Sequence, residues 1–298
     1  MPSNQAKIID GKEIAGKVRN SLAPRINELK KKGIIPGLAV VLVGDDPASQ
    51  SYVRMKEKAF AKMELYSETF RFPADISQAK LGEIITELNR NDRFHGILVQ
   101  LPLPEHLNEL DTILQISPAK DADGLHPVSL GKMMLGTDAP LPCTPHGILM
   151  LLKYSGIDPE GKHVVVIGRS NIVGKPIANL LFRKKPLGNA TVTLCHSRTR
   201  NLPDICRQAD ILIAAIGRPQ FITREYVKTD AVVIDVGVNR VEDATASRGY
   251  RLVGDVDFDD VIGKVSAITP VPGGVGPMTI SMLVANTVYL AEKSVRHT

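Results

Sequence analysis

Two side chains near residue 50 have the types and spacing needed for proton-transfer chemistry. Tyr52 and Lys56 are four residues apart, so they share one face of any helix that contains both. Gln100 ends an apolar run that indicates a buried strand, and side chains at the carboxyl ends of parallel strands face a ligand crevice. A glutamine there can hydrogen-bond a lysine of the neighbouring helix and position it. The Tyr52 and Lys56 pair alone is weak evidence, because most such pairs lie on surfaces.

Two further carboxylates, Asp121 and Asp123, stand just before Gly124. A metal site is one interpretation of this pattern. A lone Asp-x-Asp is more often a turn, and the three cysteines show no metal-ligand spacing. We therefore expect no metal.

A nucleotide fingerprint stands at residues 168–174. Four apolar residues (164–167) predict a strand, Gly168 supplies a tight turn, and a helix is expected from about residue 171. Ser170 replaces the second glycine of the common Gly-x-Gly-x-x-Gly pattern and can itself hydrogen-bond phosphate. The amino end of the helix offers free N–H groups to a phosphate.

The following strand favours NADP over NAD. An NAD site usually has an acidic residue at the end of that strand, where it holds the ribose hydroxyls. Here the strand ends in His196, Ser197 and Arg198, and a hydroxyl with a cation fits a ribose phosphate.

The segment Pro270–Thr279 contains three prolines and three glycines in ten residues and leads directly into an apolar helical pattern. Proline fixes the backbone and glycine exposes it, so this loop is a rigid, side-chain-poor surface suited to a flat ligand.

Strands alternate with helices along both halves of the chain, which predicts α/β folds with parallel sheets. The first half is expected to contain helices at 11–32, 48–63 and 77–90, with strands at Leu38–Val43, Tyr66–Phe72 and Gly96–Leu101. Thr144 is expected to cap a helix that has Pro145 in its first position.

The composition excludes several classes of protein. The 298 residues suffice for two domains, and no apolar run is long enough for a membrane span. The net charge of +5 is dispersed and aromatic residues make up only 4%, which argues against a nucleic-acid surface. Three cysteines and no export signal indicate a cytoplasmic protein.

Taken together and in this order, the motifs resemble those of the bifunctional methylenetetrahydrofolate dehydrogenase/cyclohydrolase family. The resemblance runs from Ile9-Asp10-Gly11-Lys12 to the final helix. The segments that carry it are Tyr52-Val-Arg-Met-Lys56, Gly96-Ile-Leu-Val-Gln-Leu-Pro-Leu-Pro104, Lys120-Asp-Ala-Asp-Gly124, Pro142-Cys-Thr-Pro145, Gly168-Arg-Ser-Asn-Ile-Val-Gly174 and Pro270-Val-Pro-Gly-Gly-Val-Gly-Pro-Met-Thr279.

The resemblance implies two α/β domains with a cleft between them, the second of Rossmann type. The folate-binding catalytic domain would comprise residues 1–145 with helix 277–298, and the NADP-binding domain residues 146–276. It also implies a homodimer that oxidises 5,10-methylenetetrahydrofolate with NADP and hydrolyses the methenyl product to 10-formyltetrahydrofolate in one-carbon metabolism.

The resemblance also implies residue roles. Lys56 would be the central catalytic group, oriented by Gln100, while Tyr52 would stack on the folate rings and Asp123 would grip the pterin edge. Further substrate contacts would be Ser49, Val99, Leu101, Pro272, Gly273 and Gly274. Contacts to NADP would be Gly168, Arg169, Ser170, Ser197, Arg198 and Val238.

Two other readings remain open at the level of sequence. A shikimate-dehydrogenase-like NADP oxidoreductase would share the two-domain plan and a catalytic lysine. A nucleotide-sensing module with an inactive site would not need Tyr52, Lys56, Gln100 and Asp123 together.

Overall fold

The computed structural model describes residues 6–246 and 249–295, and the chain forms two compact units. One unit comprises residues 16–143 and 280–298, and we call it the Lys56 unit. The other comprises residues 1–15 and 144–279, and we call it the Gly168 unit. The units differ from the expected domains at the N-terminus, where residues 6–15 group with residues 144–279. Throughout the described ranges, every helix is too short or too polar to cross a membrane.

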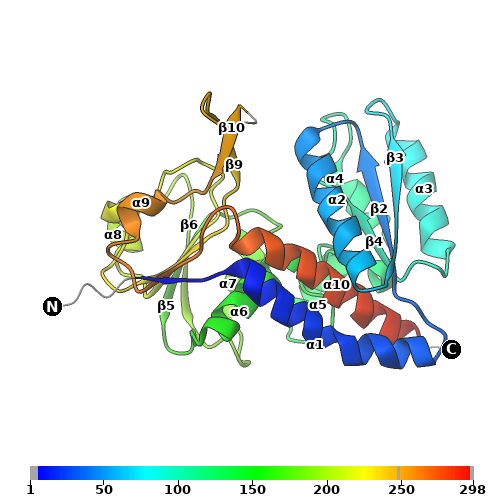
Figure 1. Ribbon diagram of the computed structural model, residues 1–298, viewed down its shortest axis with the longest axis horizontal. Coiled ribbons are helices and arrows are strands. Elements are labelled where there is room, and N and C mark those ends of the chain that lie inside the picture. Colours follow the sequence, from blue (N-terminus) through cyan, green and yellow to red (C-terminus); the bar gives the residue numbers. More distant parts are fainter. Residues whose placement is uncertain (1–5, 247–248, 296–298) are drawn as a thin grey trace. The chain divides into compact units, whose positions relative to one another are not determined.

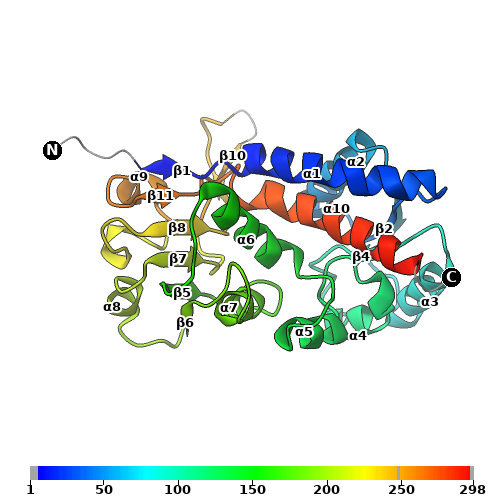
Figure 2. The same ribbon diagram turned by 90° about the horizontal axis from the view of Figure 1, so that it is seen from below.

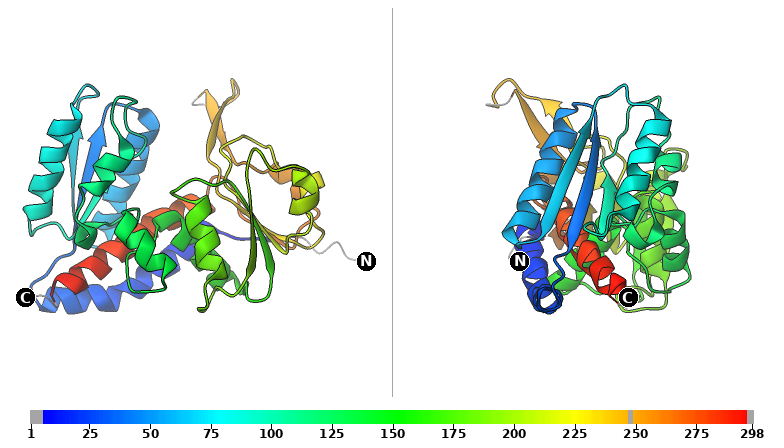
Figure 3. Two further views of the ribbon diagram at one scale, coloured as in Figure 1. Left: turned by 180° about the vertical axis from the view of Figure 1, so that it is seen from behind. Right: turned by 90° about the vertical axis from the view of Figure 1, so that its right-hand side faces the viewer.

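A three-stranded parallel sheet forms the centre of the Lys56 unit. Its strand order is β3 (Tyr66–Phe72), β2 (Gly37–Val43), β4 (Gly96–Val99). The helices on its two opposite faces are α2 (Pro47–Lys62) and α3 (Gln78–Arg90) (Figures 1 and 3). All of β2 is buried, as its continuous apolar run predicts, and alternate side chains such as Val41 pack with Leu81 and Ile85 of α3. The shorter helices are α4 (Glu109–Leu114), η1 (Pro118–Lys120) and α5 (Pro127–Met134).

A six-stranded parallel sheet forms the centre of the Gly168 unit, and Figure 2 shows its strands in their order across the sheet. The strand order is β1 (Lys7–Ile8), β11 (Ala267–Ile268), β8 (Val232–Asp235), β7 (Ile211–Ala214), β5 (His163–Ile167), β6 (Thr191–Cys195). A separate antiparallel hairpin joins β9 (Asn239–Glu242) to β10 (Tyr250–Val253). The helices of this part of the chain are α6 (Cys143–Ser155), α7 (Gly174–Phe182), α8 (Leu202–Cys206), η2 (Arg224–Tyr226) and α9 (Phe258–Val261).

Two long helices contribute residues to both units. They are α1 (Gly11–Lys31) and α10 (Val275–Ser294). Asp10 begins α1 by accepting the backbone N–H groups of Lys12 (2.8 Å) and Glu13 (3.1 Å). A Cβ on Gly11 would lie 1.7 Å from the carbonyl oxygen of Gly274, so the start of α1 packs directly on the backbone of the proline-glycine loop.

The predicted alternation of strands and helices is confirmed, but several details differ, among them the following three. Helix α6 begins at Cys143, so Thr144 lies inside its first turn and its hydroxyl pairs with that of Thr279 (2.9 Å). Helix α7 begins at Gly174 and not near 171, because the Ser170 hydroxyl accepts the N–H of Gly174 (3.3 Å) and ends the turn there. Strand β9 was not predicted, since four half-polar residues give little periodic signal.

Candidate active site

Lys56 is the central side chain of the candidate site in the Lys56 unit. Helix α2 begins at a cap in which Asp46 accepts the N–H of Ser49 (2.6 Å), and the helix carries Lys56 two turns further on. The Lys56 side chain is on the buried face, with only 8% of the residue exposed. Its ammonium nitrogen donates to Oε1 of Gln100 at 2.8 Å, so the predicted hydrogen bond is present.

Gln100 is held in the orientation that this hydrogen bond requires. Its Nε2 donates to the carbonyl of Leu101 (2.6 Å), which turns Oε1 toward Lys56. Its backbone N–H donates to the carbonyl of Val41 at the carboxyl end of the sheet (2.9 Å). The sheet therefore fixes the backbone of Gln100, and Gln100 in turn fixes the amine.

The surroundings of Lys56 favour its neutral form. Burial lowers the pKa of Lys56 because the ammonium loses its hydration, while the negative charge of Asp123 and a charged Cys143 would act in the opposite direction. Burial likewise raises the pKa of Asp123. In the described residues no ion pair joins Lys56 to a carboxylate, so desolvation decides the direction for the amine.

The two acids of the Asp-x-Asp motif have different places. Asp121 is buried and its carboxylate accepts the backbone N–H groups of Gly124 (3.0 Å), Leu125 (3.2 Å) and His126 (2.9 Å). It therefore builds the turn, as the turn interpretation expects. Asp123 does not build this turn, and its negative charge acts instead to raise the pKa of Lys56. Within the described ranges no three His, Cys, Asp or Glu residues could together hold a metal ion.

Two residues of this site were missed in the sequence. Cys143 lies beside Asp123, and burial raises the pKa of its thiol well above the usual value. Asn286 of α10 donates to the carbonyls of Ala122 (2.9 Å) and Leu141 (2.9 Å) and to the sulfur of Cys143 (3.5 Å). A signal was available for Asn286, because it is a polar residue within an apolar helical stripe.

The remaining residues expected near the substrate divide between the units. Ser49 and Val99 are buried in the Lys56 unit, and Tyr52 and Leu101 are half-buried there. Burial raises the pKa of the Tyr52 phenol. The other members, Pro272, Gly273 and Gly274, belong to the Gly168 unit.

The turn after β5 in the Gly168 unit has the form that a dinucleotide requires. Gly168 has φ +121°, and a Cβ there would lie 2.0 Å from the carbonyl oxygen of Ala215. Only glycine fits, because a side chain would strain the backbone and would also collide with the residue that follows the neighbouring strand β7. Ser170 accepts the N–H groups of Val173 (3.1 Å) and Gly174 (3.3 Å), so its oxygen caps α7.

The side chains around this turn are exposed. They comprise Arg169 and Ser170 after β5, Ser197 and Arg198 after β6, and Val238 after β8. Three parallel strands thus end in residues that a ligand above the sheet edge can reach.

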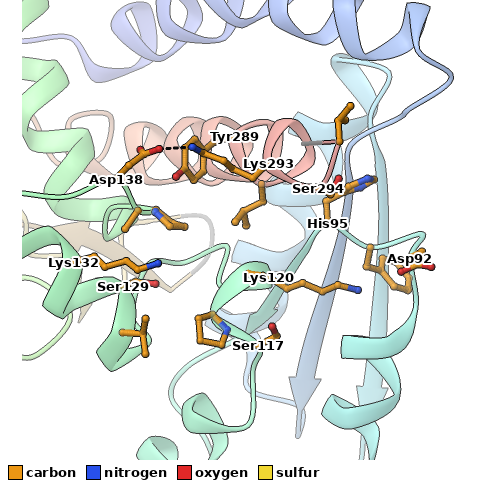
Figure 4. A pocket seen from close by; sticks show the side chains of 18 of the residues that line it. Asp92, His95, Ser117, Lys120, Ser129, Lys132, Asp138, Tyr289, Lys293 and Ser294 are labelled. Carbon is orange, nitrogen blue, oxygen red and sulfur yellow. Dashed lines mark ion pairs between the residues drawn. The ribbon is translucent and has the colours of Figure 1, made fainter. Parts of the chain in front are cut away.

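The Lys56 unit also has a hollow of about 910 Å³ that Lys56 and Gln100 do not line (Figure 4). Two of its lysines are already engaged: Lys293 pairs with Asp138 at 2.5 Å, and Lys120 donates to the carbonyl of Asn91 at 2.8 Å. The hollow lies near His95, which precedes β4, whereas Gln100 follows that strand. The hollow is therefore separate from the Lys56 and Gln100 pair.

Comparison with known proteins agrees with this geometry across both units. The model of the catalytic domain of tetrahydrofolate dehydrogenase/cyclohydrolase matches residues 9–123, and that of its NAD(P)-binding domain matches residues 142–295. The chain is 55% identical over 289 residues to the bifunctional protein FolD of Bacillus anthracis, covering 97% of this chain and 98% of that protein.

Solved structures are similar over the same extent. The bifunctional FolD of Campylobacter jejuni has a TM-score of 0.90 and 46% identity, covering 97% of this chain and 99% of that chain. The methylenetetrahydrofolate dehydrogenase-cyclohydrolase of Trypanosoma brucei, solved with NADP and an inhibitor, has a TM-score of 0.92 and 41% identity, covering 99% and 100%. With matches that span both units at these identities, the chain belongs to the tetrahydrofolate dehydrogenase/cyclohydrolase family.

Proposed function

We propose that the protein oxidises 5,10-methylenetetrahydrofolate to the methenyl compound with NADP and then hydrolyses that compound to 10-formyltetrahydrofolate. The family match over both units carries this proposal. It decides against the shikimate-dehydrogenase-like alternative. The Lys56 and Gln100 hydrogen bond argues against a sensing module with an inactive site, because it holds a buried amine ready for proton transfer.

Lys56 acts in the hydrolytic step in this proposal. Water attacks the cationic carbon between two folate nitrogens, a carbon–oxygen bond forms, and neutral Lys56 takes the proton that the water releases. The carbon–nitrogen bond to one of the two nitrogens then breaks as the hydroxyl becomes the formyl carbonyl. The leaving nitrogen takes the proton held by Lys56 and the hydroxyl proton passes to water, so one proton is released overall. Burial already lowers the pKa of Lys56, and the positive charge of the methenyl substrate disfavours the ammonium further.

In this proposal Gln100 orients the amine of Lys56 and Asp123 binds the substrate. Gln100 accepts one N–H of Lys56, which leaves the lone pair of the neutral amine for the water. We propose that Asp123 binds the polar edge of the pterin and that Tyr52 stacks on the ring system. Ser49, Val99 and Leu101 of the same unit would complete the surface around the folate.

The residues around Gly168 fit NADP. The glycine turn leaves room for a pyrophosphate against the backbone, and its Cβ position is closed to any side chain. Gly168, Arg169 and Ser170 would hold the pyrophosphate side, Ser197 and Arg198 the ribose phosphate, and Val238 the far end. When bound, NADP supplies the acceptor for the hydride of the methylene carbon.

We further propose that the protein is a cytoplasmic homodimer in which the folate occupies the Lys56 unit and NADP the Gly168 unit. Three exposed apolar side chains in β6, at the end of α7 and just before α7 support a partner surface. They are Phe182 (52%), Ile172 (44%) and Leu194 (38%). All three cysteines are free and buried, which fits a reducing compartment.

One assay tests the function. The protein is incubated with methylenetetrahydrofolate and either NADP or NAD, and reduced nucleotide and 10-formyltetrahydrofolate are followed together. We expect both products with NADP and slower reduction with NAD. Reduction without any formyl product would contradict the hydrolytic half of the proposal.

A further inference from the structure

Asp255 is a buried carboxylate with no part in the proposed chemistry and an unusual set of partners. It is 0% exposed and lies between β10 and α9 in the Gly168 unit. Its Oδ2 accepts the backbone N–H groups of Ile216 (2.6 Å) and Gly217 (2.9 Å). Its Oδ1 accepts the N–H of Arg218 (2.9 Å) and Nδ2 of Asn239 (2.9 Å).

These partners come from the carboxyl ends of two neighbouring strands. Residues 216–218 follow β7, and Asn239 follows β8 after the three-residue segment 236–238. The carboxylate of Asp255 therefore accepts hydrogen bonds from three successive backbone amides after β7 and from one side chain at the start of β9. Loops at this edge of a parallel sheet are where a dinucleotide lies.

A second buried carboxylate holds Asp255 itself in place. Asp235, 3% exposed at the end of β8, accepts the backbone N–H of Asp255 (2.9 Å), of Val256 (2.9 Å) and of Gly237 (3.0 Å). Its own N–H donates to the hydroxyl of Thr269 (2.8 Å). The chain of contacts thus runs from the end of β8 through two acids to the loop after β7.

The space around the two carboxylates is full. A Cβ on Gly237 would lie 2.2 Å from Oδ1 of Asp255, and a Cβ on Gly254 would lie 1.8 Å from Oδ2 of Asp235. No ion pair in the described part of the chain involves either acid. Backbone amides and one asparagine therefore supply the stabilisation that a cation would otherwise give.

We propose that Asp255 is a positioning residue for the dehydrogenase step, which shapes the loop of residues 216–218 and the start of β9 to receive the nicotinamide nucleotide. The inference rests on the proposed function, because it assigns these loops to NADP. Asp255 acts through the backbone it holds and touches neither reacting carbon. The hydrolytic step needs no nucleotide, so the role of Asp255 is confined to one of the two activities.

The variant Asp255→Asn tests this with little change in shape. A carboxylate accepts at both oxygens, whereas an asparagine presents an NH₂ group to at least one of the donors that it must satisfy. We expect the NADP dissociation constant to rise by about tenfold or more, from the loss of charge-assisted hydrogen bonds. We expect the rate of methenyltetrahydrofolate hydrolysis to stay within about twofold of wild type.

Asp260→Asn is the matched control. Asp260 also accepts a backbone N–H of the same unit, that of Arg224 in η2 at 2.7 Å, which does not lie at the carboxyl end of a sheet strand. NADP binding is measured by calorimetry and folding by circular dichroism for both variants. If Asp255→Asn does not fold, Asn239→Ala removes one donor from the same carboxylate and is expected to weaken NADP binding by about threefold.

The outcomes separate the inference from the function on which it rests. Weakened NADP binding with normal hydrolysis supports the positioning role. If Asp255→Asn, or Asn239→Ala in its place, binds NADP as tightly as the Asp260→Asn control, the positioning role is overturned and the proposed function is not. A parallel loss of both activities in a folded Asp255→Asn protein also overturns it, because the effect would not be confined to the nucleotide. A wild-type protein that binds no NADP overturns the proposed function and the inference together.

Discussion

The Lys56 unit and the Gly168 unit prepare their sites by opposite means. In the first, a side chain is buried and a second side chain orients it, so the chemistry depends on one amine and its pKa. In the second, exposed side chains follow the ends of the strands, on loops whose backbone is shaped by a glycine turn and by two buried carboxylates that accept amide N–H groups. Substitutions in the first unit should therefore change reaction rates, whereas substitutions in the second should change nucleotide affinity.

Lys56→Met should give the largest effect and the sharpest separation. Methionine keeps the length and the burial of the side chain but has no proton acceptor of comparable basicity. We expect hydrolysis of methenyltetrahydrofolate to fall by about a thousandfold, within the range for loss of a general base. The NADP dissociation constant should stay within about twofold. Hydrolysis within tenfold of wild type would remove Lys56 from the mechanism.

Gly168→Ala should show the converse pattern. The added Cβ meets the carbonyl of Ala215 and the residue must keep φ +121°, so the turn is strained by about 2 kcal/mol or more. We expect NADP affinity to fall by about thirtyfold, measured by calorimetry, and hydrolysis to be retained. Gly161→Ala is the control, since Gly161 has φ +70° with nothing within 4 Å of its Cβ position. If both variants weaken NADP binding equally, the turn itself is not the binding element.

Gln100→Glu should change the pH dependence of hydrolysis. Lys56 acts as a base only when neutral, so the rate falls as the pH drops below its lowered pKa. A carboxylate in place of Gln100 favours the ammonium and should move this acidic limb upward by about one pH unit. Gln100→Met adds no charge and serves as the control, from which we expect a slower rate but no upward movement of the limb. A limb that stays in place in Gln100→Glu would show that another group titrates.

His146→Leu should have the smallest effect, on acid stability in the Gly168 unit. Burial, with the charge of Arg183 adding to it, lowers the pKa of His146 to about 4, and its Nδ1 has no hydrogen-bond partner. Between about pH 6.5 and pH 4 the unfolded chain binds more protons at this residue than the folded chain, so the free energy of unfolding falls as the pH falls.

Leucine removes this proton binding. We expect the loss of stability between about pH 7 and pH 4.5, measured by urea unfolding, to be smaller in the variant by on the order of 2 kcal/mol. An identical loss in both proteins would mean that His146 titrates normally.

Features that depend on residues close together in the sequence were predictable. Tyr52 and Lys56 are recognisable by their helical spacing, and the turn at Gly168 by its place between an apolar strand and a helix. Apolar periodicity likewise predicted most strands and helices, although not the starts of α6 and α7. Thr144 shows where a local rule fails, because its hydroxyl pairs with Thr279, 135 residues away, and not with its own helix.

Features that depend on long-range contacts were not predictable from one sequence. Asn286 reaches the carbonyl of Ala122 across 164 residues, and Asp255 reaches Ile216 across 39. No local pattern marks Asp255 as buried, since an aspartate between two short elements ordinarily suggests an exposed turn. Cys143 lies in the segment of residues 142–145 that resembles the family, but only the fold shows that it lies beside Asp123.

The pairing of β1 with β11 has a consequence for the order in which the chain matures. Lys7 lies opposite Ala267, so β1 is synthesised well before the strand with which it pairs. Until that strand emerges, residues 7–8 have no place to dock. The larger sheet can therefore be completed only after β11 is synthesised, and a fragment that ends before residue 267 would lack the pairing of β1 with β11.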